Sequence, residues 1–123
     1  MGRSVPPAGN GESVLIVEDQ FLIALDLKAT LQELGCPTVE LAQNVEGALS
    51  LARTGSINAA LLDINLNGAS SFAVASVLKD RAIPFAFLTG CDQAVVPQEF
   101  ADTPILEKPF SRGDLARLLA RLS

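Results

Sequence analysis

Val14-Leu15-Ile16-Val17-Glu18-Asp19, at residues 14–19, decides the fold of this chain. Its first four residues form an unbroken apolar run rich in β-branched side chains, which is typical of a strand covered on both faces. Two acidic residues follow directly at the carboxyl end of that run. Next comes an amphipathic stretch over residues 21–34, and Gly35 supplies a stop signal for the predicted helix. The chain therefore opens with a buried strand, an acidic turn and a helix.

The same alternation of short apolar runs and amphipathic stretches continues along the chain. Further strands are predicted at residues 38–42, 59–62, 84–88 and 103–106. Further helices are predicted at residues 45–54, from Ser70 or Ser71 onward, and from the Ser111 capping box to Leu122. Between residues 92 and 100, Pro97 allows only a short or irregular helix. Five such repeats predict an α/β fold with a mostly parallel sheet and helices on both faces.

The composition excludes several classes of function. At 123 residues the chain fits one domain, and we expect a flexible leader at residues 1–12 before a domain at 13–123. Its net charge of −5 argues against nucleic-acid binding, which depends on Lys and Arg neutralising phosphates. The chain has no histidine, which excludes Ser-His-Asp and Cys-His nucleophiles, His-Cys zinc sites and any phosphohistidine of its own.

The cysteine and hydropathy patterns predict a cytoplasmic location. Cys36 and Cys91 are too few for a disulfide scaffold and lack metal-ligand spacing, so a reducing compartment is the natural setting. No stretch reaches the roughly 18 consecutive apolar residues of a membrane span, and the first residues lack the apolar core of a signal peptide. We therefore expect no membrane partner.

Polar residues stand at the carboxyl ends of four predicted strands. Glu18 and Asp19 follow the first strand, Asp63 the third, Thr89 the fourth and Lys108 the fifth. In parallel α/β sheets the ligand site lies beyond these carboxyl ends, so we expect the five side chains to converge. Three neighbouring carboxylates repel one another and need a cation, and oxygen ligands suit Mg²⁺. Carboxylates, Mg²⁺, a lysine and a hydroxyl together permit phosphoryl transfer to an aspartate.

These residues, in this order and at these strand ends, resemble the response-regulator receiver domain of two-component systems. The resemblance covers about residues 13–122 and includes Lys108-Pro109-Phe110 after the last strand. It implies a flavodoxin-like (βα)5 fold with strand order 2-1-3-4-5. It also implies a cis peptide bond between Lys108 and Pro109.

The resemblance implies a role for each site residue. Asp63 would accept a phosphoryl group from a phosphohistidine on a histidine kinase or a histidine phosphotransfer protein. Asp19, Asp63 and the backbone carbonyl of Asn65 would bind Mg²⁺ directly, and Glu18 would assist through water. Lys108 would contact one phosphoryl oxygen, and the hydroxyl of Thr89 would bond another.

The segment Pro84-Phe85-Ala86-Phe87-Leu88-Thr89-Gly90 resembles a P-F-x-F-x-T-G signature of stand-alone receivers in alphaproteobacterial stress signalling. Three departures from the family pattern concern the readout of the signal. Cys91 replaces an aromatic that often follows the signature, and Ile105 replaces the usual aromatic three residues before the lysine. Asn67-Gly68 occupies a loop that commonly contains a proline.

The leading prediction is a single-domain response regulator that signals by protein contact or drains phosphoryl groups. Slow hydrolysis of its own aspartyl phosphate would be a timer and not a metabolic enzyme activity. One alternative is a receiver-like module that acts without phosphorylation, which Ile105 favours. A haloacid-dehalogenase-like phosphatase is a weaker alternative, because that family has a second Asp where this chain has Asn65. Dinucleotide binding is excluded by the lack of a Gly-x-Gly-x-x-Gly motif after the first strand.

Overall fold

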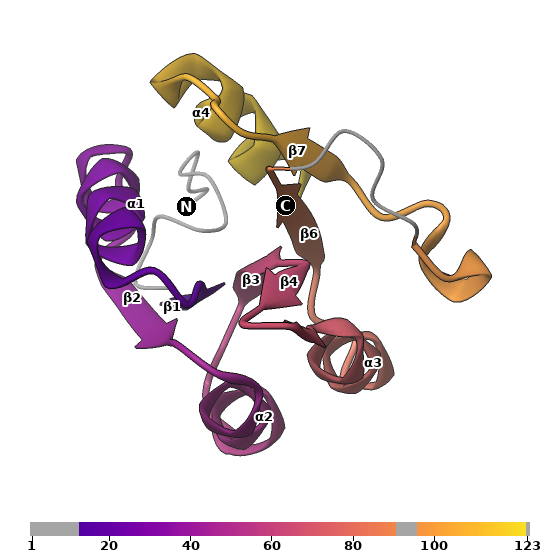
Figure 1. The fold of residues 1–123 in the computed structure, drawn as a ribbon. Helices are drawn as coiled ribbons and strands as arrows, with labels where there is room; N and C mark the ends of the chain where they lie inside the picture. Colours follow the sequence, from indigo (N-terminus) through magenta and orange to yellow (C-terminus); the bar gives the residue numbers. More distant parts are fainter. Residues whose placement is uncertain (1–12, 91–95, 123) are drawn as a thin grey trace, which may run out of the picture.

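A parallel sheet of five strands forms the centre of the structure, a computed structural model that describes residues 13–90 and 96–122 (Figure 1). The strands lie in the order β2-β1-β3-β6-β7, which confirms the predicted order because β6 and β7 are the fourth and fifth predicted strands. The predicted leader at residues 1–12 and Cys91 lie outside the described residues. The strands are β1 (Ser13–Val17), β2 (Thr38–Ala42), β3 (Ala59–Asp63), β6 (Phe85–Thr89) and β7 (Ile105–Glu107).

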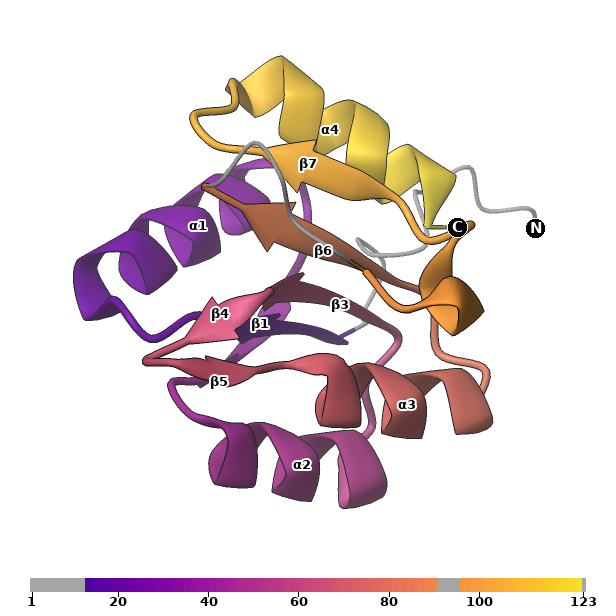
Figure 2. The ribbon, with the colours of Figure 1, turned by 45° about the vertical axis from the view of Figure 1, so that its right-hand side comes forward.

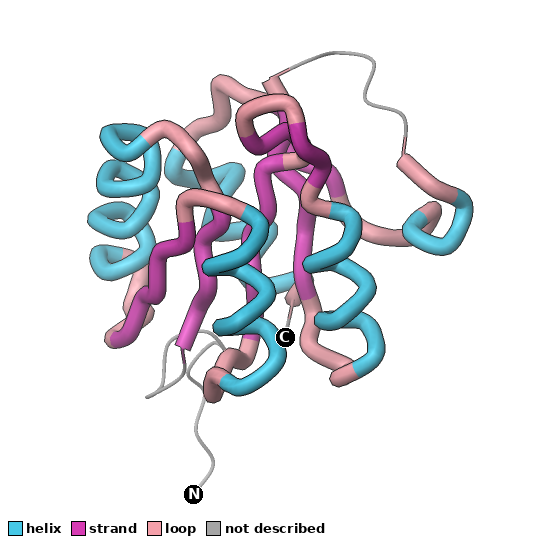
Figure 3. The backbone as a smooth tube through the Cα atoms, turned by 60° about the horizontal axis from the view of Figure 1, so that its bottom comes forward, coloured by secondary structure: helices cyan, strands magenta, loops and turns pink. Residues whose placement is uncertain are grey.

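Helices cover both faces of the sheet, as the alternating pattern predicts (Figures 2 and 3). α1 (Phe21–Glu33) and α4 (Arg112–Arg121) pack on one face, and α2 (Val45–Thr54) and α3 (Phe72–Asp80) pack on the other. Each helix turns a stripe of buried side chains toward the sheet, such as Leu27 and Leu31 of α1. Since β1 and β3 lie between two helical layers, their side chains are buried on both faces. This burial explains the unbroken apolar runs in their sequences.

An aromatic cluster fills the core on the α3 side of the sheet. Phe85 and Phe87 point to the same face, as their spacing by two residues predicts, and their ring centroids lie 5.6 Å apart. Phe72 from α3 and Phe100 complete the cluster. Phe100 ends the 3₁₀ helix η1 (Gln98–Phe100), which is the described part of the predicted irregular helix. The buried ring of Phe100 therefore anchors this short segment to the sheet.

The sequence Asn65-Leu66-Asn67-Gly68 after β3 predicts a loop, but a small antiparallel hairpin occupies this place. Its strands are β4 (Asn65–Leu66) and β5 (Ala69–Ser70), and Asn67-Gly68 forms the connecting turn. The φ angles of Asn67 and Gly68 are 53° and 89°, which match the type I′ turn of two-residue hairpins. Asn-Gly is the strongest sequence signal for that turn. α3 begins at Phe72 with Ser71 as its N-cap residue, in agreement with the predicted start at Ser70 or Ser71.

The last strand, β7 (Ile105–Glu107), begins two residues later than the predicted strand at residues 103–106. Thr103 donates its backbone N–H to the carbonyl of Phe100 at 3.0 Å, which closes the turn after η1. Pro104 has no N–H to donate to a neighbouring strand. Regular pairing with β6 therefore starts at Ile105, opposite Phe87.

Among the described residues, no helix is both long enough and apolar enough to cross a bilayer.

The predicted capping box at the start of α4 is present, and its removal gives a test of the fold. The hydroxyl of Ser111 accepts from the N–H of Asp114 at 3.0 Å, and the Asp114 carboxylate accepts from the N–H of Ser111 at 3.0 Å. We expect Ser111→Ala to lower the free energy of unfolding by about 1 kcal/mol, measured by urea denaturation followed by circular dichroism. Ser50→Ala, the same change at an exposed position in α2, should leave stability unchanged or slightly higher. Equal losses in both variants would contradict this assignment.

Candidate functional site

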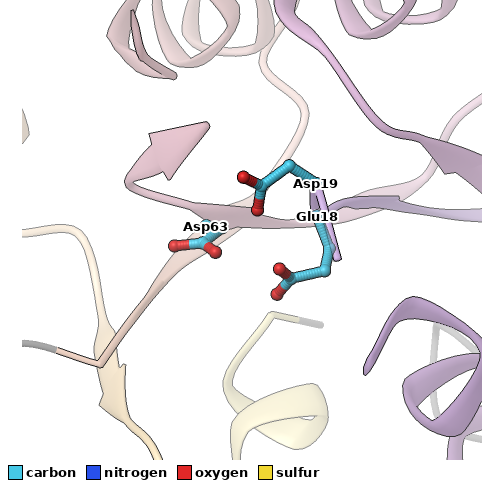
Figure 4. A group of neighbouring side chains, drawn as sticks. All are labelled: Glu18, Asp19 and Asp63. Atoms are coloured by element: carbon cyan, nitrogen blue, oxygen red, sulfur yellow. The ribbon is translucent and has the colours of Figure 1, made fainter. Parts of the chain in front are cut away.

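Neighbouring strands bring the three acidic residues together. β1 and β3 pair in parallel with Val17 opposite Leu62, so Glu18 and Asp63 follow at the same level and Asp19 comes next. The backbone N–H of Glu18 donates to the carbonyl of Ala42 at 3.0 Å, which extends the sheet pairing past β1. Each of the three side chains offers a carboxylate oxygen, and these oxygens lie within 4.8 Å of one another (Figure 4). The predicted convergence of these carboxylates is confirmed.

Burial makes this concentration of negative charge costly. Glu18 has no exposed surface and Asp63 is 8% exposed, whereas Asp19 is partly exposed. Loss of hydration raises the pKa of Glu18, and the nearby charge of Asp63 adds to the increase. Hydrogen bonds from Lys108 and from the backbone N–H of Gln20 oppose it without cancelling it. Positive charge beside the cluster therefore favours the ionised form of Glu18.

Lys108 supplies part of that charge from the far side of β6. Its ammonium Nζ lies 2.9 Å from Oε1 of Glu18 and 3.2 Å from Oδ2 of Asp63. Burial alone would lower the pKa of Lys108, but the hydrogen bond to Glu18 and the charges of Asp63 and Glu18 outweigh it, so the pKa is raised. The backbone N–H of Lys108 donates to the carbonyl of Thr89 at 2.7 Å. The peptide bond to Pro109 is cis, as predicted.

Thr89 and Asn65 lie beside this cluster on adjoining segments. Thr89 is buried at the carboxyl end of β6, the strand between β3 and β7. Asn65 begins the hairpin two residues after Asp63, and its backbone N–H approaches Oδ1 of Asp63 at 3.4 Å. All six site residues predicted from the sequence therefore occupy one end of the sheet.

Sequence reasoning missed two backbone donors at the site. The N–H of Gln20 donates to Oε2 of Glu18 at 3.2 Å, and the N–H of Asn67 donates to Oδ2 of Asp19 at 3.0 Å. The first has no sequence signal, because any residue at position 20 except proline offers the same group. The second could have been found from Asn67-Gly68, since that pair predicts a tight hairpin turn after Asp63.

The donor set fits a hard divalent cation. Three carboxylates face the single ammonium of Lys108, so the cluster retains an excess of negative charge that one divalent ion would offset. Oxygen ligands in this number are those that Mg²⁺ prefers, with water completing its coordination. Asp19 is the most exposed of the three carboxylates, Asp63 is nearly buried and Glu18 lies deepest.

Comparison with known proteins agrees with this arrangement. Residues 14–120 match the response regulator receiver domain family. The chain belongs to the response regulator receiver domain family. The receiver domain is 31% identical over 115 residues to the phyllosphere-induced regulator PhyR of Methylorubrum extorquens. That alignment covers 88% of this chain and 42% of PhyR, so the chain spans about two fifths of the length of this relative.

Two solved structures of SdrG resemble the receiver domain closely. The solution structure of SdrG from Sphingomonas melonis Fr1 is 43% identical, with a TM-score of 0.80, and the match covers 90% of this chain and 95% of SdrG. The BeF3-activated conformation of SdrG from Pseudomonas melonis Fr1 is 42% identical, with a TM-score of 0.75, and the match covers 90% of this chain and 96% of SdrG. Both comparisons support the receiver fold described above.

The departure at Ile105 has a clear structural setting. Ile105 opens the edge strand β7 and is 45% exposed, although its partner in the register, Phe87, is fully buried. An aliphatic side chain therefore stands where most receivers have an aromatic one.

The ion pair with Lys108 can be tested through the ionisation of Glu18. We expect Lys108→Ala to leave the protein folded and to raise the pKa of Glu18 further, because a buried carboxylate loses its cation and a hydrogen bond. The pKa would be measured without Mg²⁺ from the NMR shift of the Glu18 carboxyl carbon. A carboxyl whose pKa is raised by folding favours the native state at low pH and loses that contribution as pH rises through the folded pKa. The stability lost in the variant should therefore be greater at neutral than at acidic pH.

Lys108→Arg is the control for this experiment, because it keeps the positive charge. It should raise the pKa of Glu18 less than Lys108→Ala does. An unchanged titration of Glu18 in Lys108→Ala would show that the ion pair does not control this carboxyl.

Proposed function

We propose that this receiver domain accepts a phosphoryl group on Asp63, with Mg²⁺ bound, and acts as a single-domain response regulator. The observation that supports this most directly is the contact of Lys108 Nζ with Oδ2 of Asp63, beside the carboxylates of Glu18 and Asp19. A nucleophilic carboxylate, a cation ligand set and a lysine for the incoming anion thus meet at one end of the sheet. These are the functional groups that phosphoryl transfer requires, because the reaction depends on positioning and charge stabilisation.

In the proposed transfer, an oxygen of the Asp63 carboxylate attacks the phosphorus of a phosphohistidine. The P–O bond forms as the P–N bond breaks, and the electron pair of that bond returns to the imidazole nitrogen. Lys108 would then exchange its contact with Asp63 for one with a phosphoryl oxygen, and the hydroxyl of Thr89 would bond another. Bound Mg²⁺, held by Asp19, Asp63 and the Asn65 carbonyl with Glu18 assisting through water, would supply additional charge stabilisation.

The donor in this proposal is another protein. The chain contains no histidine, so the phosphohistidine must belong to a histidine kinase or to a histidine phosphotransfer protein. The phosphorylated receiver would signal by protein contact or drain phosphoryl groups, in the cytoplasm, and its net charge of −5 disfavours a nucleic-acid partner. Slow hydrolysis of the aspartyl phosphate would end the signal.

A second function has support from one specific observation. Ile105 is exposed and aliphatic, so a readout based on an inward-turning aromatic at this position is not available. The chain would then act as a receiver-like interaction module that does not depend on phosphorylation. A haloacid-dehalogenase-like phosphatase is less well supported. Asn65 stands two residues after Asp63, and an uncharged amide cannot serve as the general acid and base.

Phosphorylation of Asp63 can be tested with small-molecule donors. We expect the protein with Mg²⁺ and acetyl phosphate to gain the mass of one phosphoryl group, seen by intact mass spectrometry. Beryllofluoride should shift the amide NMR signals of β6, and the BeF3-activated structure of SdrG makes this reagent a natural probe. Asp63→Asn should abolish both responses, because an amide lacks a nucleophilic oxygen. Asp80→Asn, at an exposed position at the end of α3, should leave both intact.

The outcomes separate the candidate functions. No change that depends on Asp63 would reject the phosphoacceptor and favour the phosphorylation-independent module. Rapid turnover of free phosphate esters would instead favour the phosphatase.

A further inference from the structure

We infer that the Asn67-Gly68 turn of the hairpin is a positioning element that orients the carboxylate of Asp19 for Mg²⁺. This inference rests on the proposed function, because it concerns the same cation site. It assigns a role to a backbone group at the tip of β4–β5, which lies beside the loop between β1 and α1 (Figure 2).

The contact that supports this inference joins distant parts of the sequence. The backbone N–H of Asn67 donates to Oδ2 of Asp19 at 3.0 Å, across 48 positions of the chain. Within residues 13–90 and 96–122, this is the one hydrogen bond that the Asp19 carboxylate accepts. Glu18 and Asp63, in contrast, are both held by Lys108. Asp19 is also the least buried of the three, so its orientation depends most on this contact.

The turn is built to hold that N–H in place. Asn67 and Gly68 both have positive φ, a conformation that asparagine and glycine adopt more readily than other residues. The side-chain oxygen of Asn65 accepts from the N–H of Gly68 at 2.9 Å, and this hydrogen bond joins the first residue of the hairpin to its turn. Leu66 is only 3% exposed and packs into the core with α3, so it fixes the base of the hairpin. The tip is therefore rigidly connected to the sheet that carries Asp63.

The bond has a direct consequence for cation binding. It occupies a lone pair on Oδ2 and fixes the plane of the carboxylate, which leaves Oδ1 free to act as a ligand. Removal of a group that hydrogen-bonds to a metal ligand and orients it commonly lowers metal affinity by about 10-fold to 100-fold. The same hairpin contributes Asn65, whose carbonyl is a proposed ligand. One element thus presents a ligand and orients another.

The test uses Mg²⁺ alone and the binding constant as its readout. We expect Asn67→Val to weaken Mg²⁺ binding about 10-fold or more in isothermal titration calorimetry, because a β-branched residue resists positive φ and displaces the N–H. Asn67→Gly keeps both the N–H and the left-handed conformation, so its affinity should stay within about twofold of the wild type. Gly68→Ala is a second perturbing variant. Its new Cβ would meet nothing within 4 Å, so only the φ of 89° resists the change.

Ala82→Val is the matched control for general loss of stability. Ala82 also has positive φ, at 59°, but it lies just before β6 begins, at the opposite end of the sheet from the cluster. It should lose stability as Asn67→Val does and keep the wild-type affinity for Mg²⁺. Circular dichroism would confirm that each variant is folded, and Gly68→Ala decides the question if Asn67→Val does not fold.

Three outcomes would count against the inference. Wild-type affinity in folded Asn67→Val, or in Gly68→Ala where Asn67→Val fails to fold, overturns it. Equal losses in Asn67→Gly and Asn67→Val also overturn it, since the side chain and not the N–H would then matter. A comparable loss in Ala82→Val would assign the effect to stability. If the wild-type protein itself binds no Mg²⁺, the proposed cation site fails first, which is a distinct result.

Discussion

Electrostatic repulsion between three carboxylates is the constraint on which the rest of the site depends. The parallel register of β1 against β3 forces Glu18 and Asp63 to the same level, and Asp19 follows immediately. The sheet therefore creates the repulsion, and the surrounding structure offsets it with an ammonium and two backbone N–H groups. Each of these donors reaches the cluster from a different segment of the chain. The acidic end of the sheet is therefore formed jointly: the segments at the ends of β1 and β3 supply the carboxylates, and the segment after β7 and the hairpin supply donors to them.

The cost of this cluster explains where the stability of the protein has to come from. β1, which Glu18 and Asp19 follow, and β3, which ends at Asp63, are built from buried apolar residues apart from Ser13 and Asp63. Burial of apolar surface is the dominant favourable term in folding, so these strands can tolerate charge at their ends. The aromatic cluster around Phe87 likewise buries apolar surface along β6, which ends at the polar residue Thr89. Packing in the middle of each strand thus supports chemistry at its end.

Most of the fold could be predicted because local patterns determine it. Apolar runs of four or five residues locate β1 and β3, and helical spacing locates α1 and α4, so the layers follow from general packing rules. The convergence of Glu18, Asp19 and Asp63 also follows, since carboxyl ends of parallel strands share one edge. The start of β7 could not be predicted from its apolar run. It depends on a hydrogen bond from Thr103 to Phe100, and the position of Phe100 is set by tertiary packing.

In the hairpin, a local sequence signal and the geometry of the site depend on the same two residues. Asn67-Gly68 departs from the proline-containing loop of most receivers, and the sequence alone relates this departure only to the readout of the signal. In the structure the same two residues form a turn whose N–H contacts Asp19. A proline at position 67 could not make this contact, because it lacks an N–H and its φ is fixed near −65°. Asn67 therefore supplies a hydrogen-bond donor that a proline would lack, and this donor contacts Asp19 of the acidic cluster.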